Sequence, residues 1–348
     1  MATTLRTADR SWSALISDLL VGRELTRAEL WWAMDAVVGG EASSAQISGL
    51  LIALRAKGET PGEIAALAAG LRRHALAVDV PGPFVDIVGT GGDGTGAVNI
   101  STMAAIVAAS TGVTVVKHGG RAASSQTGGS ADLVEHLGIP LSLSPADVLR
   151  TVETAGLAYL FAPRFNPGLR QVAAVRRELG VPTAFNVLGP LISPADPQYQ
   201  LVGVADARMQ PVIAQVLADR GSTALVVRGD DGLDKLTTTA ASCVWVVRDG
   251  HAVPELLDPR ALGLPLSSLA DLRGSTAPGN AAVLRSVLAG DPGPVRDVVL
   301  LNAAAAVAVS HLGPEPLALQ LAAALDLCTK AIDTGQTATT LARWVDAY

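Results

Sequence analysis

The feature that most constrains the fold is a short apolar strand that leads into a glycine-rich turn and then into a helix. The strand is predicted over Phe84–Val88, the turn is Gly89-Thr90-Gly91-Gly92-Asp93, and the helix begins near Asn99-Ile100-Ser101-Thr102. Glycines let the backbone approach a ligand and aim several N–H groups at one anion, and a helix N-terminus adds free amides. The segment therefore predicts an anion site in an α/β protein, although a lone glycine turn also suits simple packing.

Polar side chains within this segment extend the prediction. The hydroxyls of Ser101 and Thr102 can donate hydrogen bonds to phosphate oxygens. The carboxylate of Asp93 can bind a metal ion or accept a hydrogen bond from a ribose hydroxyl.

A second loop of the same kind follows the next predicted strand, Val113–Val116. It begins Lys117-His118-Gly119-Gly120-Arg121 and continues through Ser125 to Gly129-Ser130. The chain has only four lysines, so a lysine and an arginine in one glycine- and serine-rich loop are informative. Their charges can oppose phosphate while the serine hydroxyls donate to it. Two such loops after successive strands favour phosphate binding over a merely solvated loop.

The remainder of the chain predicts two parts. Before Pro81-Gly82-Pro83 the patterns are helical from Trp12 to about His74, with helix starts at Thr26, Ser43 and Thr60-Pro61. Afterwards, β-rich runs alternate with helical patterns, at 159–161, 200–204, 224–227 and 243–247. The sequence therefore predicts an α/β fold: a small helical domain over 1–74 and a large α/β domain over 83–348 with a mostly parallel central sheet. Ligands of such sheets bind beyond the carboxyl ends of the strands.

Composition excludes some classes of function. Charged residues make up 17% of the chain and the net charge is −6, which argues against a nucleic-acid binder with its basic stripe. The uncharged stretch Gly94–Val116 is long enough to span a bilayer, but its Gly, Ser, Thr and Asn content favours a buried helix followed by a buried strand. Cys243 and Cys328 are far apart in sequence, and we interpret them as two buried thiols in a reducing cytoplasm. A cytoplasmic protein without a membrane span is expected.

Taken together, the two loops resemble the signature segments of the anthranilate phosphoribosyltransferase family. Further segments that resemble it are Ala45-Gln46-Ile47, Leu54–Thr60, Val175–Gly180, Phe185–Leu191, Gln200–Val204, Asp231–Asp234 and Asn280-Ala281. The resemblance runs in order over nearly the whole chain. It implies a nucleoside phosphorylase/phosphoribosyltransferase-like fold, a helical segment near 168–190 that joins the first domain, and a homodimer formed mainly through the helical domain.

The resemblance also implies an activity and a set of site residues. The family transfers the phosphoribosyl group of phosphoribosyl pyrophosphate (PRPP) to an aromatic amine, using Mg²⁺ and releasing pyrophosphate. Loops and resemblance together assign donor binding to Gly89, Thr90, Gly91, Gly92, Asp93, Asn99, Ser101, Thr102, Lys117, Arg121, Ser125, Gly129 and Ser130. The acceptor residues implied are His118, Gly120, Asn166 and Arg176, and Lys117, His118 and Arg176 are the catalytic candidates. Ser101 and Asp234 are implied near metal.

Four positions depart from the family pattern. Gly120 replaces an Asn, Asn166-Pro167 replaces His-Pro, Lys235 replaces a metal-binding carboxylate, and Leu191-Ile192-Ser193-Pro194 replaces Leu-Thr-Asn-Pro. The first two alter the acceptor channel and predict a changed aromatic acceptor, such as a substituted aminobenzoate of specialised metabolism. Neutral change in an enzyme of tryptophan biosynthesis that uses anthranilate is the alternative.

Lys235 leaves three alternatives open. Its ammonium can take the place of a magnesium ion and neutralise pyrophosphate directly, or Asp230 or Asp231 can supply the missing carboxylate, or catalysis has been lost. Because the donor loops are otherwise intact, retained chemistry with one weakened metal site is favoured.

Two rival functions remain at this stage. A nucleoside phosphorylase of the same fold needs no magnesium, but the Arg176-Arg177-Glu178-Leu179-Gly180 segment argues against it. A non-catalytic paralogue that binds a ligand or nucleic acid is disfavoured by the acidic balance and by the intact glycine turn.

Overall fold

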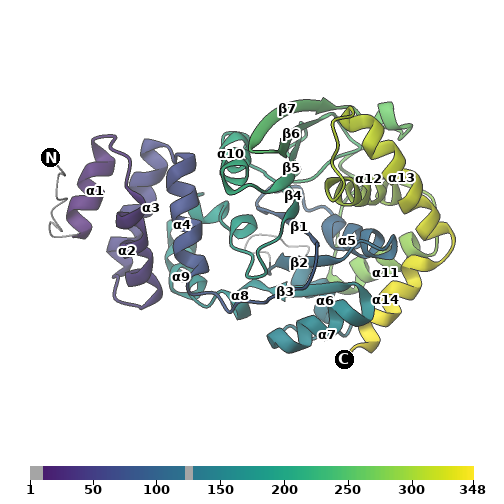
Figure 1. Cartoon of the computed structure of the whole chain (residues 1–348), viewed down its shortest axis with the longest axis horizontal. Coiled ribbons are helices and arrows are strands. Elements are labelled where there is room, and N and C mark those ends of the chain that lie inside the picture. The colour runs from purple at the N-terminus through teal and green to yellow at the C-terminus, as the bar shows by residue number, and fades with distance from the viewer. Residues whose placement is uncertain (1–10, 122–127) are drawn as a thin grey trace.

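The first helices begin at hydroxylated residues that cap them. Thr26, Ser43 and Thr60 each accept a hydrogen bond from the backbone N–H three residues later, and the side chain there bonds back to the cap, as the sequence predicts. In the computed structural model, which describes residues 11–121 and 128–348, these helices form a bundle at one end of the molecule (Figure 1). They are α1 (Trp12–Leu20), α2 (Arg27–Val38), α3 (Ser44–Lys57) and α4 (Pro61–Arg72).

Seven strands form one sheet in the order β3-β2-β1-β4-β5-β6-β7. Their bounds are β1 Val85–Gly89, β2 Val115–Gly119, β3 Leu157–Phe161, β4 Tyr199–Gly203, β5 Thr223–Gly229, β6 Ser242–Arg248 and β7 His251–Leu257. The first five strands in chain order are parallel, and β6 and β7 are antiparallel. A helical N-terminal domain followed by a large α/β domain with a mostly parallel sheet confirms the predicted fold class.

The edge strand β7 is absent from the sequence-based prediction. It is largely exposed and carries Pro254, so it lacks the apolar run by which the other strands are found. Asp249 and Gly250 join it to β6 as a two-residue turn, with φ angles of 52° and 76°. An Asp-Gly pair is a strong hairpin signal, so the strand was detectable from its turn rather than from its own residues.

Helices cover both faces of the sheet (Figure 1). One face packs on α5 (Ile100–Ser110) and on helices from the end of the chain, in a core that includes Ile87, Leu201 and Leu225. The other face packs on α10 (Gln210–Arg220), in a core that continues into the helical bundle. The remaining helices are α6 Ser130–His136, α7 Pro145–Ala155, α8 Ala162–Phe165, α9 Leu169–Leu179, α11 Ala277–Leu288, α12 Pro294–Val309, α13 Leu317–Asp333 and α14 Gln336–Asp346, with 3₁₀ turns η1 Ala184–Asn186, η2 Gly189–Leu191 and η3 Pro259–Leu262.

Two arrangements bear on the site. The chain steps from β1 outward to β2 and β3, then returns to β4 on the other side of β1. This reversal leaves a crevice at the carboxyl ends of β1 and β4, where open α/β sheets bind their ligands. In addition, α9 packs against α2 and α3 of the bundle, so it faces the crevice from the helical side.

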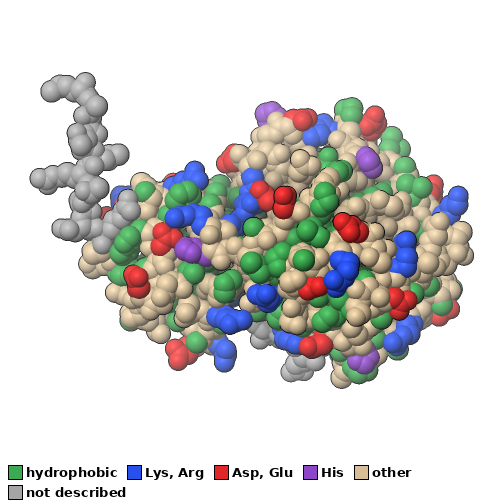
Figure 2. Space-filling view, turned by 60° about the horizontal axis from the view of Figure 1, so that its bottom comes forward, with side chains coloured by type: hydrophobic (Ala, Val, Ile, Leu, Met, Phe, Trp, Pro, Cys, Tyr) green, Lys and Arg blue, Asp and Glu red, His purple; other side chains and the backbone are tan. Residues whose placement is uncertain are grey.

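The uncharged stretch 94–116 contains α5 and the start of β2, both buried, as predicted. Within the described ranges, none of the helices is both long and apolar enough to cross a membrane. On the face shown in Figure 2, basic and acidic side chains of the described residues are interspersed rather than forming a continuous basic stripe.

Candidate active site

A cavity of about 1000 Å³ opens where the parallel strands end. Gly89, Gly119 and Gly203, the last residues of β1, β2 and β4, all line it. The predicted site residues that line the cavity are Gly89, Thr90, Gly91, Gly92, Asp93, Asn99, Ser101, Lys117, His118, Gly120, Arg121, Gly129, Ser130, Arg176, Asp234 and Lys235. Thr102 and Asn166 lie behind the wall, and Ser125 lies outside the described residues.

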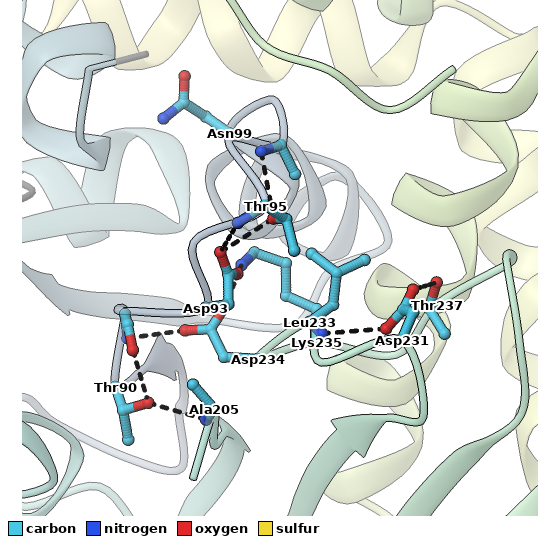
Figure 3. Close-up of polar contacts among 12 residues, drawn as sticks. Thr90, Asp93, Thr95, Asn99, Ala205, Asp231, Leu233, Asp234, Lys235 and Thr237 are labelled. Carbon is cyan, nitrogen blue, oxygen red and sulfur yellow. Dashed lines mark hydrogen bonds and ion pairs between the residues drawn. The ribbon is translucent and has the colours of Figure 1, made fainter. Parts of the chain in front are cut away.

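The glycine turn after β1 takes a shape that only glycine adopts easily. Gly91, Gly92, Gly94 and Gly96 all have φ between 65° and 79°. The turn is nevertheless anchored. The Gly91 N–H donates to Asp234 Oδ2 at 2.7 Å, and the Thr90 N–H donates to the Gly203 carbonyl at 2.9 Å. The Thr90 hydroxyl in turn accepts from the Ala205 N–H at 3.1 Å (Figure 3). The N–H groups of Thr90 and Gly91 are thus used to fix the shape of the turn.

The two hydroxyls predicted at the start of α5, those of Ser101 and Thr102, lie on different sides of the helix. Ser101 lines the cavity, whereas Thr102 lies about 100° further round the helix and is 1% exposed. Among the described residues, the Thr102 hydroxyl has no hydrogen-bond partner. Asn99 is used as a link: its amide donates to the Gly128 carbonyl at 3.3 Å and its oxygen accepts from the Asn280 amide at 2.7 Å. Ser101 is therefore the hydroxyl of this helix that faces a ligand.

The end of β2 places Lys117 beneath the cavity. Its ammonium contacts the Ile87 carbonyl of the neighbouring strand. Burial lowers the pKa of Lys117, and the nearby Asp86 carboxylate opposes that shift. Burial likewise raises the pKa of Asp86, whose Oδ1 accepts from the His118 N–H at 3.0 Å.

His118 is held as a neutral ring. Its Nδ1 lies 3.2 Å from the Gly189 carbonyl, which can only accept, so this nitrogen carries the proton. Its Nε2 is then the acceptor for the Asn166 amide at 3.2 Å. Burial lowers the pKa of His118 to about 4, and the Lys117 charge contributes to the shift. Both ring nitrogens are thus engaged by the protein, and Asn166 reaches the cavity through His118 rather than directly.

Arg121 and Ser130 border the outer part of the cavity. The Arg121 guanidinium pairs with Asp132 and, at 2.7 Å, with Glu135, so two carboxylates already offset its charge. The Ser130 hydroxyl hydrogen-bonds the Tyr159 hydroxyl at 2.8 Å and donates to the Gly120 carbonyl at 3.3 Å.

Asp93, Asp234 and Lys235 form a charged cluster on the wall (Figure 3). The Lys235 ammonium contacts Asp234 Oδ1 and lies 3.2 Å from Asp93 Oδ2. Burial alone would raise the pKa of Asp93, but the Lys235 charge and hydrogen bonds from Thr95 hold it well below its usual value. Burial alone would lower the pKa of Lys235, but the two carboxylates raise it. Asp93 and Lys235 are therefore both charged at neutral pH.

The alternative carboxylates suggested by the sequence are placed elsewhere. Asp231 accepts from the Leu233 N–H at 3.0 Å and from the hydroxyls of Thr237 and Thr239, so it shapes the loop after β5. Asp230 is exposed, and neither residue lines the cavity.

Apolar side chains line another part of the cavity, beside one arginine. Leu169, Phe185 and Ile192 line it together with Arg176 on α9. Burial lowers the pKa of Arg176. In the part of the chain that the structure describes, its guanidinium has no ion-pair or hydrogen-bond partner. A half-buried cation without a counter-ion calls for an anionic group in the cavity.

Some lining residues were not predicted. Arg273, Ser275 and Thr276 precede α11 and face the glycine turn, and Asn302 of α12 hydrogen-bonds the backbone of Leu236. The Gly274 N–H donates to the Gly96 carbonyl at 2.8 Å and so ties this segment to the turn. Ser-Thr before Ala277-Pro278 is a helix-start signal, but nothing local indicates which loop that helix faces.

Comparison with known families gives the class to which this fold and cavity belong. The model "Glycosyl transferase family, helical bundle domain" matches residues 13–75, and "Glycosyl transferase family, a/b domain" matches residues 81–338. The chain thus has both parts of a two-domain glycosyl transferase, in order.

Individual relatives narrow this class. The anthranilate phosphoribosyltransferase of Streptomyces griseus is 53% identical over 98% of this chain and 96% of its own. That of Acidothermus cellulolyticus is 54% identical with the same two coverages. This chain belongs to the anthranilate phosphoribosyltransferase family, a family of pentosyltransferases, and the resemblance seen in its loops is confirmed.

Solved structures agree. The anthranilate phosphoribosyltransferase of Thermus thermophilus superposes with a TM-score of 0.88 at 39% identity, covering 96% of this chain and 98% of that one. The Saccharomyces cerevisiae enzyme, solved in complex with PRPP and Mg, gives a TM-score of 0.87 at 29% identity, covering 97% and 98%.

Proposed function

We propose that this chain transfers the phosphoribosyl group of PRPP to the amine of an aromatic acid, anthranilate or a related aminobenzoate, and releases pyrophosphate. The observation that carries the proposal is the division of one cavity into two halves. One half offers the glycine turn, the start of α5 and Lys117, and the other offers apolar side chains beside Arg176, which has no partner among the described residues. The names of the relatives support the same reaction.

The donor half suits a sugar that carries phosphate groups. Amides of the glycine turn, the start of α5 and the Ser101 hydroxyl provide donors, and Lys117 provides charge. We assign less of the donor binding to Arg121, because its side chain is 47% exposed at the outer rim and both of its terminal nitrogens are already paired with Asp132 and Glu135. Because Thr102 is buried and does not line the cavity, we assign it no contact with the donor.

The acceptor half suits an aromatic carboxylate. Arg176 can bind the carboxylate in a bidentate manner, while Leu169, Phe185 and Ile192 contact the ring. Since neutral His118 has both nitrogens engaged, we give it a shape-determining role rather than that of a general base.

The reaction then requires little beyond positioning. The bond between the ribosyl C1 and the pyrophosphate oxygen breaks with its electron pair, positive charge develops at C1, and the lone pair of the neutral amine forms the new C–N bond. The amine proton is lost afterwards to water or to a pyrophosphate oxygen. Such a reaction is accelerated by holding the two partners together and by stabilising the departing charge, which the amides and Lys117 do here.

Magnesium has a limited place in this proposal. The two carboxylates of the cavity wall are already paired with Lys235, and no cluster of three or more possible metal ligands occurs among the described residues. The chain therefore does not offer a ready two-carboxylate metal site. We infer that Mg²⁺ would arrive as the counter-ion of the diphosphate, with the Ser101 hydroxyl of the cavity wall as a candidate ligand.

The acceptor is proposed to be anthranilate with tolerance for a substituent. Among the described residues, the nearest heavy atom to a Cβ on Gly120 would be the Ala162 Cβ at 3.9 Å, which is an ordinary van der Waals contact. Asn166 contacts His118 rather than the cavity. Having Asn at this position in place of the family's His therefore changes the partner of the His118 ring and not a direct contact with the acceptor.

Three further features belong to the proposal. The division into residues 1–74 and 83–348, with segment 168–190 joining the first, is supported by the packing of α9 on α2 and α3. A homodimer through the helical domain is supported by the exposed apolar side chains Leu20, Val21 and Ile52. A cytoplasmic location is supported by the unpaired thiols Cys243 and Cys328.

The test is to supply the purified chain with PRPP, Mg²⁺ and a panel of aminobenzoates, and to follow pyrophosphate release. Release that depends on anthranilate or a substituted aminobenzoate is expected. Turnover with a nucleoside and inorganic phosphate instead would identify a phosphorylase and contradict the proposal.

A further inference from the structure

We propose that Lys235 provides, from the chain itself, one of the cations that neutralise the diphosphate of the donor. This chain should then bind PRPP with little dependence on divalent metal. The inference rests on the proposed function, since it concerns the same donor half of the cavity.

The position of the ammonium carries the argument. Lys235 lines the cavity beside the glycine turn, and its side chain keeps 18% of its surface exposed there. Its Nζ contacts the carboxylates of Asp234 and Asp93 (Figure 3). An ammonium has three N–H donors, so one remains after these two contacts. A charged donor is thus presented beside the amides that suit phosphate oxygens.

The surrounding structure fixes this position. Asn302 holds the backbone of the next residue from both sides: its Oδ1 accepts from the Leu236 N–H at 3.1 Å and its Nδ2 donates to the Leu236 carbonyl at 2.8 Å. A Cβ on Gly203 would overlap the Asp234 backbone, and a Cβ on Gly89 would overlap its carboxylate. The segment 234–236 therefore lies against the ends of β1 and β4 because these residues are glycines.

Charge balance explains why a metal is not also required at this place. The two carboxylates would attract a divalent ion if they stood alone, but Lys235 already occupies the space between them. An incoming ion would have to displace the ammonium and would repel it at short range. The same carboxylates hold Lys235 in its charged form, so the cation is present before the donor binds.

The rival explanation is that Lys235 only braces the glycine turn through Asp93 and Asp234. If Lys235 is only a brace, its loss should lower the stability of the chain without changing how PRPP binding depends on metal. The proposal predicts such a link, so the two are separated by measuring PRPP binding with and without metal.

The first experiment is calorimetry of PRPP binding to the full chain, in Mg²⁺ and in EDTA. Wild type should lose no more than about threefold in affinity in EDTA. The affinity of Lys235→Gln for PRPP should fall about tenfold or more in EDTA, as expected for the loss of one charged hydrogen bond. Mg²⁺ should restore most of that affinity. Lys235→Arg, which keeps the charge, should stay close to wild type. Lys330→Gln on α13, an exposed lysine away from the cavity, is the matched control.

The second experiment is direct binding of Mn²⁺, followed by electron paramagnetic resonance without PRPP. Lys235→Glu places three carboxylates together and should bind Mn²⁺, whereas wild type and Lys330→Glu should not. Equal EDTA sensitivity of wild type and Lys235→Gln, or Mn²⁺ affinity unchanged in Lys235→Glu, would overturn the inference. If wild type binds no PRPP in either buffer, it is the proposed function that fails; Mn²⁺ binding still reports on Lys235. Melting temperatures show which variants are folded.

Discussion

Arg176 shows how a single side chain defines the acceptor. It is partly buried beside apolar residues, and its guanidinium has no partner in the described part of the chain. A carboxylate on the substrate would satisfy it, which fits an aromatic acid better than a neutral amine.

We therefore predict that Arg176→Met weakens the acceptor rather than the donor. KM for the aromatic acid should rise about thirtyfold, for a lost charged hydrogen bond of about 2 kcal/mol, while KM for PRPP changes little. Arg176→Lys should restore only part of the affinity for the aromatic acid, because an ammonium lacks the bidentate geometry. The neighbouring Arg177, exposed on α9 and outside the cavity, serves as the control as Arg177→Met. Equal effects on both substrates would rule out this role.

His118 gives a prediction about pH. Its pKa is about 4 in the folded chain because of burial, against about 6.5 when unfolded. Below pH 6.5 the unfolded chain binds a proton at this ring, whereas the folded chain does not until the pH approaches 4. The contribution of neutral His118 to the free energy of unfolding is therefore fully present above pH 6.5. It falls as the pH drops towards 4, by up to about 3 kcal/mol.

Denaturant titrations of wild type and His118→Gln test this directly. The variant should show a flatter pH profile between 6.5 and 4, while His311→Gln, at an exposed position, should match wild type. Parallel profiles for His118→Gln and wild type would mean that the folded chain protonates this ring as readily as the unfolded chain does.

At the scale of elements, the site depends on how closely two loops approach. The segment after β5 lies on the ends of β1 and β4, where Asp234 leaves no room for a Cβ on Gly203. The loops are brought together by backbone shape as much as by side-chain contacts.

Gly203→Ala should consequently destabilise the fold by more than about 2 kcal/mol and weaken PRPP binding, because the backbone of Asp234 must move. Gly62→Ala is the matched change: its Cβ would meet only ordinary contacts on α4, and it should be neutral or stabilising. Thermal unfolding of the two variants gives the comparison, and similar melting temperatures would contradict the close approach.

Local signals explain which elements were predictable. Capping residues at Thr26, Ser43 and Thr60 mark helix starts because they act on backbone groups three residues away. Strands β1 to β6 were found because they are short apolar runs, and β7 was missed because an exposed edge strand has none.

The site was predictable only in part for the same reason. The glycine turn and the loop after β2 carry their chemistry in consecutive residues. Arg273 faces the same cavity from a distant segment, and the burial of Asn166 behind His118 depends on packing. The sequence likewise leaves open which acids pair with Lys235, whereas the structure brings Asp93 of the glycine turn to it, beside its chain neighbour Asp234.

At the scale of the molecule, the helical bundle presents apolar side chains to solvent. Leu20 is 70% exposed and Val21 is 82% exposed at the end of α1, and Ile52 on α3 is 40% exposed. The two helices pack on each other, so these side chains belong to one part of the bundle. Such exposure suits an interface between two copies.

Sedimentation of the wild type should accordingly give the mass of a dimer, and Val21→Glu with Ile52→Glu should give a monomer at the same concentration. Leu319→Glu on α13, where the side chain is 64% exposed, should leave the mass unchanged. A wild type that sediments as a monomer at micromolar concentration would exclude the proposed interface.

Donor binding as proposed requires that the glycine turn and the loop after β2 together hold a ribose carrying both a monophosphate and a diphosphate. Titration of PRPP into the purified chain, followed by heat release, tests this most directly. We expect saturable binding with one PRPP per chain, competed by pyrophosphate. An absence of binding heat over a range of temperatures, with and without Mg²⁺, would contradict it.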